Sequence, residues 1–243
     1  MKPVYAFILI CAAAFAAPSP ASPSPAPPSP ANDAGSVPPL ADVLKRLDQK
    51  ASQFRNMSAK AASVDHTAVL NSDDPESGTV FMKKTGGSVQ GLMNTVLPDP
   101  KTSVFSGREV QIYYPNMKRV DIYDTGKNGE QLEQFLTLGF GTSAADLQKT
   151  YDIKVLPTEN IQSEKTVHLQ LIPKSEDARK MISKVELWIG EHDYPIQEKI
   201  YEPSGNYHLV SYSDVQINSP SFKDQDVQLK RPPGVKDNRP GKQ

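Results

Sequence analysis

The order of apolar and polar residues predicts one helix at the start of the folded part of the chain. From Leu40 to Phe54, apolar residues recur at intervals of three or four: Leu40, Val43, Leu44, Leu47, Ala51 and Phe54. This spacing is typical of an amphipathic helix with one apolar stripe. Pro38 and Pro39 stand where a helix tolerates proline, at its start. The stripe needs an apolar surface to cover, and a sheet is the simplest one.

A period of two then predicts half-buried antiparallel strands. It is clearest where apolar residues alternate with polar ones: Val110, Ile112 and Tyr114; Val167, Leu169 and Leu171; Val185, Leu187 and Ile189. Proline and other turn-forming residues bound these and further strands. The other expected strands are 57–70, 78–84, 89–97, 104–114, 119–124, 196–202, 206–217 and 226–230.

Between two blocks of strands the period becomes helical. Residues on one predicted helix face recur at i, i+3, i+4 and i+7: Leu132, Phe135, Leu136 and Gly139. Gly139 and Gly141 are good residues to end such a helix. Ser143 with Asp146 three residues later resembles a capping box, which predicts a second short helix that ends near Tyr151.

About ten strands with one helix before them and two short helices between them predict an α+β fold. A flat sheet of this size rarely persists without curling, so we expect a strongly curved antiparallel sheet or open β-barrel. The N-terminal helix and the inserted helices should lie on its concave face. The apolar sets Val80 with Met82, Val110 with Ile112, and 185–189 should line that face.

The first residues predict export from the cytoplasm. Residues 4–17 are continuously apolar and follow Lys2, which is short for a bilayer span and typical of a signal peptide. Ala14-Phe15-Ala16 predicts cleavage after Ala16, with an uncleaved anchor as the alternative. Cys11 follows Ile10 rather than the small residue that precedes a lipid-modified cysteine, so we assign it to the signal peptide.

The predicted organisation has four parts. Residues 1–16 form the signal peptide, and residues 17–37 a spacer rich in proline, alanine and serine that cannot form a packed core. One folded domain is expected over 38–233, followed by a mobile tail over 234–243. The spacer should behave as a semi-rigid extended segment.

Charge and rare residues exclude several classes of protein. The chain has 27 Lys and Arg against 28 Asp and Glu, for a net charge of −1, so it lacks the basic excess of a nucleic-acid-binding protein. One cysteine cannot form an intramolecular disulfide. Four scattered histidines are a poor ligand set for zinc, and we expect neither metal nor cofactor.

No known catalytic motif is present. The sequence lacks G-x-S-x-G, a P-loop and H-E-x-x-H. Asp65-His66 and His192-Asp193 could each supply a base and an orienting carboxylate, but neither has an identifiable nucleophile. Adjacent residues of a strand also point to opposite faces. We therefore expect no catalytic residues, and a secreted hydrolase is the remote alternative.

Several segments, in order, resemble the LolA family of periplasmic lipoprotein carriers. They span nearly all of 40–235: GTVFMKK at 78–84, FSGREVQIYYP at 105–115, the stretch 132–153, VHLQLIPK at 167–174, VELWIGEHDYP at 185–195, and PPGV at 232–235. The chain departs from the family at Lys83-Lys84, where the family usually has an arginine that latches the lid. The aromatic strand carries Tyr113-Tyr114 and lacks the family's tryptophan.

The resemblance implies roles for individual residues. Acyl chains would contact a cavity lined by Val80, Met82, Val110, Ile112, Tyr114, Val185, Leu187 and Ile189. The lid that covers this cavity would carry Leu132, Phe135, Leu136 and Leu138. Lys84 would replace the latch arginine and hydrogen-bond carbonyl groups of the closed lid.

The resemblance also implies a function. The chain would be a monomeric periplasmic carrier that shields the acyl chains of lipoproteins or related lipids on the way to the outer membrane. Its partners would be the acylated cargo, an inner-membrane donor complex and an outer-membrane acceptor. The alternative is an envelope sensor or protein-binding module that uses the same fold without transferring lipid.

Overall fold

The computed structural model describes residues 35, 37–86, 88–126 and 138–240. The helices of these residues are α2 (Leu40–Gln53), α4 (Ala144–Thr150) and α5 (Glu176–Arg179), with 3-10 turns η1 (Pro115–Met117) and η3 (Asp224–Val227). The strands are β1 (Asn56–Thr67), β2 (Ser72–Thr85), β3 (Ser88–Leu97), β4 (Lys101–Ser106), β5 (Glu109–Tyr114), β6 (Arg119–Asp124), β7 (Tyr151–Ile161), β8 (Glu164–Pro173), β9 (Lys184–Ile189), β10 (Pro195–Tyr201), β11 (Tyr207–Ile217) and β12 (Lys236–Asn238).

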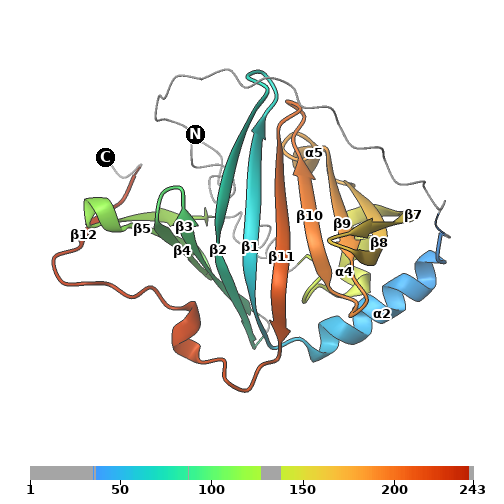
Figure 1. Cartoon of the computed structure of the whole chain (residues 1–243), viewed down its shortest axis with the longest axis horizontal. Helices are drawn as coiled ribbons and strands as arrows, with labels where there is room; N and C mark the ends of the chain where they lie inside the picture. The colour runs from blue at the N-terminus through green and yellow to red at the C-terminus, as the bar shows by residue number, and fades with distance from the viewer. Residues whose placement is uncertain (1–34, 36, 87, 127–137, 241–243) are drawn as a thin grey trace.

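All twelve described strands belong to one sheet, in the order β12-β6-β5-β4-β3-β2-β1-β11-β10-β9-β8-β7. Every neighbouring pair is antiparallel except β12 and β6, which are parallel. The sheet is open, because β7 and β12 form its two edges (Figure 1). The predicted α+β fold with an open, curved antiparallel sheet is confirmed.

Two expected strands differ from the observed ones. A turn at Gly107, whose φ is +60°, divides the predicted strand 104–114 into β4 and β5. The segment expected as a strand at 226–230 instead begins inside η3, whose Val227 is buried, and continues without regular structure. The first difference arises because a glycine turn can interrupt an apolar run without changing its period of two on either side.

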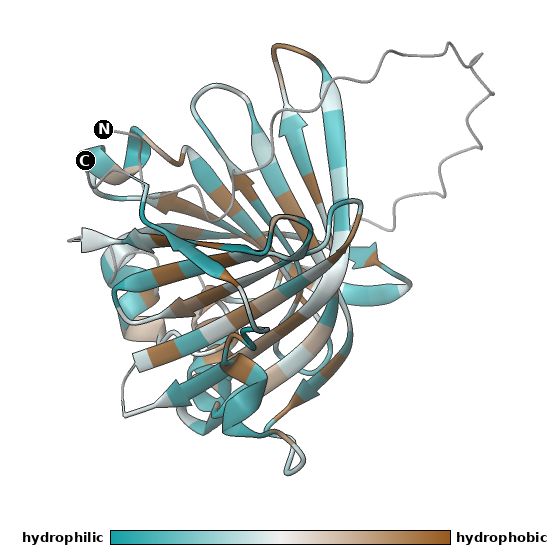
Figure 2. Ribbon diagram, turned by 90° about the vertical axis from the view of Figure 1, so that its left-hand side faces the viewer, coloured by the Kyte–Doolittle hydropathy of each residue, from teal (hydrophilic) through white to brown (hydrophobic). Residues whose placement is uncertain are grey.

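Helix α2 forms where the apolar stripe predicts it and packs on one end of the sheet. Val43 and Leu47 are 1% and 3% exposed and share a cluster with Leu171 and Leu187 of β8 and β9. The face of the sheet that α2 covers is called the inner face below. Figure 2 shows apolar bands alternating with polar ones along the strands, as a sheet with one packed face requires.

Helix α4 begins with the predicted cap. The Ser143 hydroxyl accepts a hydrogen bond from the Asp146 backbone N–H at 3.1 Å and donates to the Asp146 carboxylate at 2.6 Å. Asp48 of α2 accepts a further bond from the Ala144 N–H at 2.9 Å. The two helices are therefore joined through the first turn of α4.

The C-terminal segment crosses the outer face of the sheet. After β11 it contacts Phe81 of β2 through Phe222 and then reaches β12 (Figure 1). The part expected as a tail from residue 234 thus contributes a three-residue strand beside β6. No helix within the described residues combines the length and the apolar character needed to cross a bilayer.

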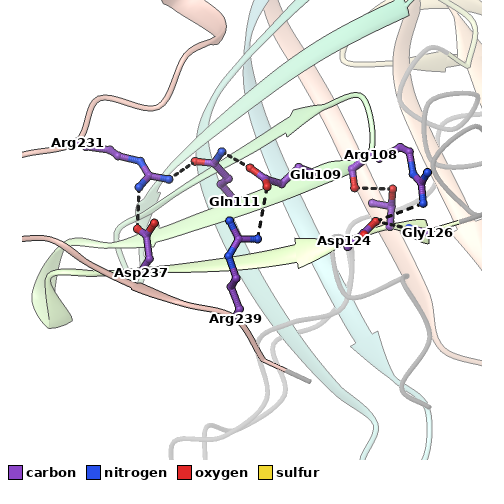
Figure 3. A network of polar contacts seen from close by, with 9 residues as sticks. Arg108, Glu109, Gln111, Asp124, Gly126, Arg231, Asp237 and Arg239 are labelled. Carbon is purple, nitrogen blue, oxygen red and sulfur yellow. Dashed lines mark hydrogen bonds and ion pairs between the residues drawn. The ribbon is translucent and has the colours of Figure 1, made fainter. Parts of the chain in front are cut away.

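Polar contacts attach this segment to the sheet. Arg231 donates to the Gln111 side chain and to Asp237 at 2.7 Å each, and Arg239 lies 3.7 Å from Glu109 (Figure 3). Glu109 and Gln111 alternate with the apolar residues of β5, so their side chains lie on the outer face. These polar contacts, together with the Phe81–Phe222 ring contact, attach the segment to the outer face, while the apolar core occupies the inner face.

Candidate functional site

The strand registers place the predicted cavity residues of the first half of the sheet on the inner face. Directly paired residues project to the same side of a sheet. Met82 of β2 is paired with Gly91 of β3, which is paired with Phe105 of β4 and, through it, Val110 of β5. Val80 of β2 shares the parity of Met82. Ile112 and Tyr114 follow Val110 at intervals of two.

The same face continues into the second half of the sheet. Ser63 of β1 is paired with Val210 of β11, which is paired with Glu198 of β10 and then Leu187 of β9. Val185 and Ile189 share the parity of Leu187. The three apolar sets expected on one face are therefore brought together there.

These residues contribute to three packed clusters. The set from β9 lies under α2, where Val185 and Leu187 are 0% exposed. Met82 belongs to a central cluster with Val80 packed against it. Phe105, Val110 and Ile112 form a third cluster, with Tyr114 packed against it. Contact of these residues with an acyl chain stays a prediction.

The segment from Leu138 to Gly141 covers the middle of the inner face and is called the cover segment below. Phe140 is 1% exposed, and its ring lies 6.4 Å from that of Phe54, 6.1 Å from Tyr194 and 5.5 Å from Tyr212. Leu138 is equally buried, in the cluster under α2. The other predicted lid residues, Leu132, Phe135 and Leu136, lie outside the described residues.

The glycines of the cover segment allow its close approach to the sheet. Gly139 has φ of +77°, and a Cβ atom added there would lie 2.4 Å from the Pro195 Cγ. A Cβ atom on Gly141 would lie 3.1 Å from the Phe54 ring. In the sequence these glycines predict only the end of a helix. The sequence does not show that they also allow Phe140, which stands between them, to pack against rings from distant parts of the chain.

Lys84 lies against the cover segment. Its Nζ atom donates a hydrogen bond to the Gly141 carbonyl oxygen at 3.0 Å. The adjacent Lys83 points to the outer face and pairs there with Asp224, as the alternation of a strand requires. The contact of Lys84 is of the kind that the latch hypothesis describes, and its role in closing a lid stays a prediction.

A pocket of about 570 Å³ lies beside the cover segment. It shares Tyr194 and Tyr212 with the ring cluster around Phe140. Its lining residues are Lys50, Gln162, Glu164, Gly190, His192, Tyr194, Pro195, Ile196, Tyr212, Ser213, Asp214, Val215 and Ile217. The set combines aliphatic and aromatic walls with charged and other polar groups, a combination suited to an amphiphilic ligand.

Helix α2 is also attached beside this pocket. Arg46 donates through Nε to the Asp193 carboxylate at 2.8 Å, which joins the helix to the turn between β9 and β10. The Lys50 ammonium lies 5.5 Å from the centre of the Tyr194 ring, within the range of a cation–π contact. The helix therefore contributes to one wall of the pocket.

Glu198 is an inner-face residue that sequence reasoning missed. The residue is 8% exposed, and burial raises the pKa of its carboxyl group to about 8. Burial, reinforced by the charge on Glu198, also raises the pKa of Tyr212 well above its usual range. The available signal was the alternation of Ile196, Glu198 and Ile200, which puts an acid at an apolar position of the strand.

The two Asp-His pairs do not assemble a catalytic set. Asp65 contacts His208 at 2.5 Å and His66 contacts Asp73 at 2.7 Å. The two residues of the first pair thus have separate partners on opposite faces of β1. Across the described parts of the chain, no group of three or more His, Cys, Asp or Glu side chains is placed to hold a metal ion.

An open antiparallel sheet with helices on its inner face is the class of fold that the chain adopts. The profile of the family described as outer membrane lipoprotein carrier protein LolA matches residues 65–225. The chain belongs to this family. No curated protein sequence gives a significant match.

Solved structures resemble the chain at low sequence identity, and one of those compared has a TM-score above 0.5. An uncharacterized conserved protein from Thermus thermophilus superposes with a TM-score of 0.51 at 10% identity, over 82% of this chain and 98% of that one. The Pseudomonas aeruginosa MucA/MucB complex superposes with a TM-score of 0.43 at 12% identity, over 78% of this chain and 60% of that one. The lipoprotein LppX from Mycobacterium tuberculosis superposes with a TM-score of 0.45 at 11% identity, over 76% of this chain and 100% of that one.

Replacing Gly139 with alanine tests the close approach of the cover segment. Gly139→Ala should lower the free energy of unfolding by about 2–4 kcal/mol, because it adds a left-handed backbone cost to an overlap with Pro195. Gly107→Ala is the matched control, since Gly107 has φ of +60° and open space around it. The control should lose only about 1–2 kcal/mol in urea unfolding. Equal losses in the two variants would contradict the observed packing.

Proposed function

We propose that this protein carries the acyl chains of lipoproteins or related lipids through the periplasm toward the outer membrane. The observation that carries the proposal is the cover segment: it buries Phe140 on the apolar inner face next to a pocket, and one lysine contacts its end. Family membership supports the same function, because the family is described as a carrier of lipoproteins.

Export to the periplasm fits the apolar run at residues 4–17, which is typical of a signal peptide. In this proposal the signal peptide is cleaved after residue 16, and residues 17–37 form a spacer. In the periplasm the protein would receive its cargo from an inner-membrane complex and deliver it to an outer-membrane acceptor. The carrier acts as a monomer and without catalysis in this proposal.

The need for such a carrier follows from the cost of exposing acyl chains. Each methylene group removed from water contributes about 0.8 kcal/mol, so a sixteen-carbon chain left in water costs on the order of 12 kcal/mol. Apolar contacts are non-directional, so an apolar face can hold chains of different cargo proteins. Release requires a competing occupant of that face, which is the role we assign to Phe140.

Carrier action then involves two states of the cover segment. In the closed state Phe140 fills the ring cluster of Phe54, Tyr194 and Tyr212. An acyl chain would displace it and pack in its place, continuing into the adjacent pocket. The volume of that pocket, about 570 Å³, lies within the ordinary range of small-molecule sites. When the cargo leaves, Phe140 returns and covers the face.

A second candidate is an envelope sensor or protein-binding module without lipid transfer. The packing under α2 favours it, because Val185 and Leu187 are fully buried by the protein itself and offer no free surface. A protein partner would then bind elsewhere on the molecule. The two functions differ in whether the purified protein binds an acyl chain.

A charge in the pocket should weaken acyl binding. Val215 lines the pocket, whereas Gln216 is exposed and points to the opposite face. Val215→Glu should weaken the affinity for a fluorescent fatty-acyl probe at least about tenfold, because it places a charge in an apolar wall. Gln216→Glu adds the same charge to the other face and should bind as the wild type does. Unchanged affinity in the folded Val215→Glu variant would refute this site.

Removing the contact of Lys84 should favour the open state. A hydrogen bond from a charged donor contributes about 1.5–3 kcal/mol, and the apparent affinity of a ligand rises with the fraction of molecules open to it. Lys84→Ala should therefore tighten binding of the same probe about tenfold or more. Lys83→Ala, which removes the outer-face lysine, should leave the affinity unchanged. Equal or weaker binding in Lys84→Ala would exclude its role as a latch.

A further inference from the structure

Glu198 places a carboxyl group on the inner face among apolar neighbours. Along β10 it lies between Ile196 and Ile200, and across the sheet it is paired with Leu187 on one side and Val210 on the other. It is 8% exposed. An acid thus occupies a position whose cross-strand neighbours are apolar.

No hydrogen bond to the carboxyl group is found within the part of the chain that the structure describes, and burial is the cause of its raised pKa. Glu186, on the neighbouring strand and the opposite face, is also buried but accepts hydrogen bonds from Lys184 and Tyr201 at 2.8 Å each. Buried polar groups are almost always hydrogen-bonded. An acid at such a position without such bonds is therefore a candidate for contact with a ligand.

Glu198 lies between the pocket and the cover segment. Tyr212 of β11 lines the pocket and is close enough for the charge on Glu198 to raise its pKa. Gly139 of the cover segment lies against Leu187, the partner of Glu198 on β9. A chain that displaced the cover segment and entered the pocket would pass this carboxyl group.

The carboxyl group is neutral over most of the physiological pH range, since burial raises its pKa to about 8. A neutral carboxyl group donates one hydrogen bond through its O–H and also accepts. The other titratable groups on this face nearby are Tyr212 and the pair His208–Asp65 on β11 and β1. The described residues of the cover segment and the inner-face residues of β9 contribute none.

We propose that Glu198 donates a hydrogen bond to the carbonyl oxygen of the ester or amide group that links an acyl chain to its cargo. This inference rests on the proposed carrier function and adds a polar anchor to it. Apolar contacts alone do not fix how far a chain slides along a surface. One directional bond at the carbonyl group would set the depth at which the chain lies.

The test compares probes that share one pyrene-labelled chain and end in a methyl ester, an N-methyl amide or a plain hydrocarbon. Well below pH 8, the wild type should bind the ester and the amide about tenfold more tightly than the hydrocarbon, the effect of one hydrogen bond to a buried group. Well above pH 8 the preference should disappear, because the ionised group no longer donates. A preference for only one of the two linkages would identify which of them the cargo carries.

Glu198→Leu should remove the preference and keep hydrocarbon binding. Glu198→Gln keeps a neutral donor and should retain the preference at both pH values. Glu186→Gln, which changes the acid on the outer face, should keep the pH dependence of the wild type. Because the pair His208–Asp65 is intact in Glu198→Gln, loss of the pH dependence there assigns the titration to Glu198.

The pH dependence of unfolding tests the titration of Glu198 without any bound probe. A raised pKa in the folded state means that the wild type loses stability as pH rises from the ordinary glutamate pKa to about 8, and then no further from this group. Glu198→Gln should lack this contribution.

Two results would overturn the inference. If Glu198→Leu keeps the ester and amide preference, or if the preference of the wild type is the same above pH 8, the carboxyl group is no anchor. The carrier function would survive both results, since the hydrocarbon would still bind. If no probe binds the wild type, the carrier function fails and the anchor fails with it.

Discussion

The structure depends on how an open sheet covers its apolar inner face. A closed barrel would bury that face by itself, but here β7 and β12 remain edges and the face needs other elements on it. Helix α2 covers β8 and β9, and the cover segment fills the centre with Phe140. The two covers differ in kind. The helix contributes a long apolar stripe to the core. The cover segment is four residues long, buries Leu138 and Phe140, comes close to its neighbours at two glycines and contacts Lys84 at one end.

This difference connects the fold to the proposed carrier function. A long amphipathic helix is costly to displace from a sheet, because several buried side chains must lose their contacts together. A surface covered by one aromatic ring can exchange that ring for a ligand of similar character at a smaller cost. The pocket beside Phe140 and the acid at Glu198 lie next to this second cover. The part of the inner face that we propose to be exchangeable therefore lies beside the pocket and the buried acid.

Local patterns predicted much of the fold. The stripe from Val43 to Ala51 identified α2, and Ser143 with Asp146 identified the start of α4, because helix period and capping depend on residues a few positions apart. Alternation on β5 and β9 correctly indicated which side chains share a face. The parallel strand β12 was not expected, since three exposed residues, Lys236–Asn238, carry no apolar period.

The candidate site was harder to predict because it depends on distant contacts. Phe140 stands between two glycines that locally signal the end of a helix, and its burial requires Phe54, Tyr194 and Tyr212 from other parts of the chain. Local alternation with isoleucines puts Glu198 at an apolar position, but its burial also depends on the registers of β10 with β9 and β11, which the sequence does not display. Lys84 was identified through the family resemblance and the parity of its strand, and its contact with Gly141 lies on that face.

Native mass spectrometry of the mature protein, purified from the envelope of its own host, tests the central claim most directly. The carrier account predicts a population whose added mass matches an acylated lipoprotein or lipid and is lost when acyl chains are extracted with detergent. A protein that carries no acylated species, or only a protein partner without acyl chains, would contradict that account and favour a binding module of the same fold.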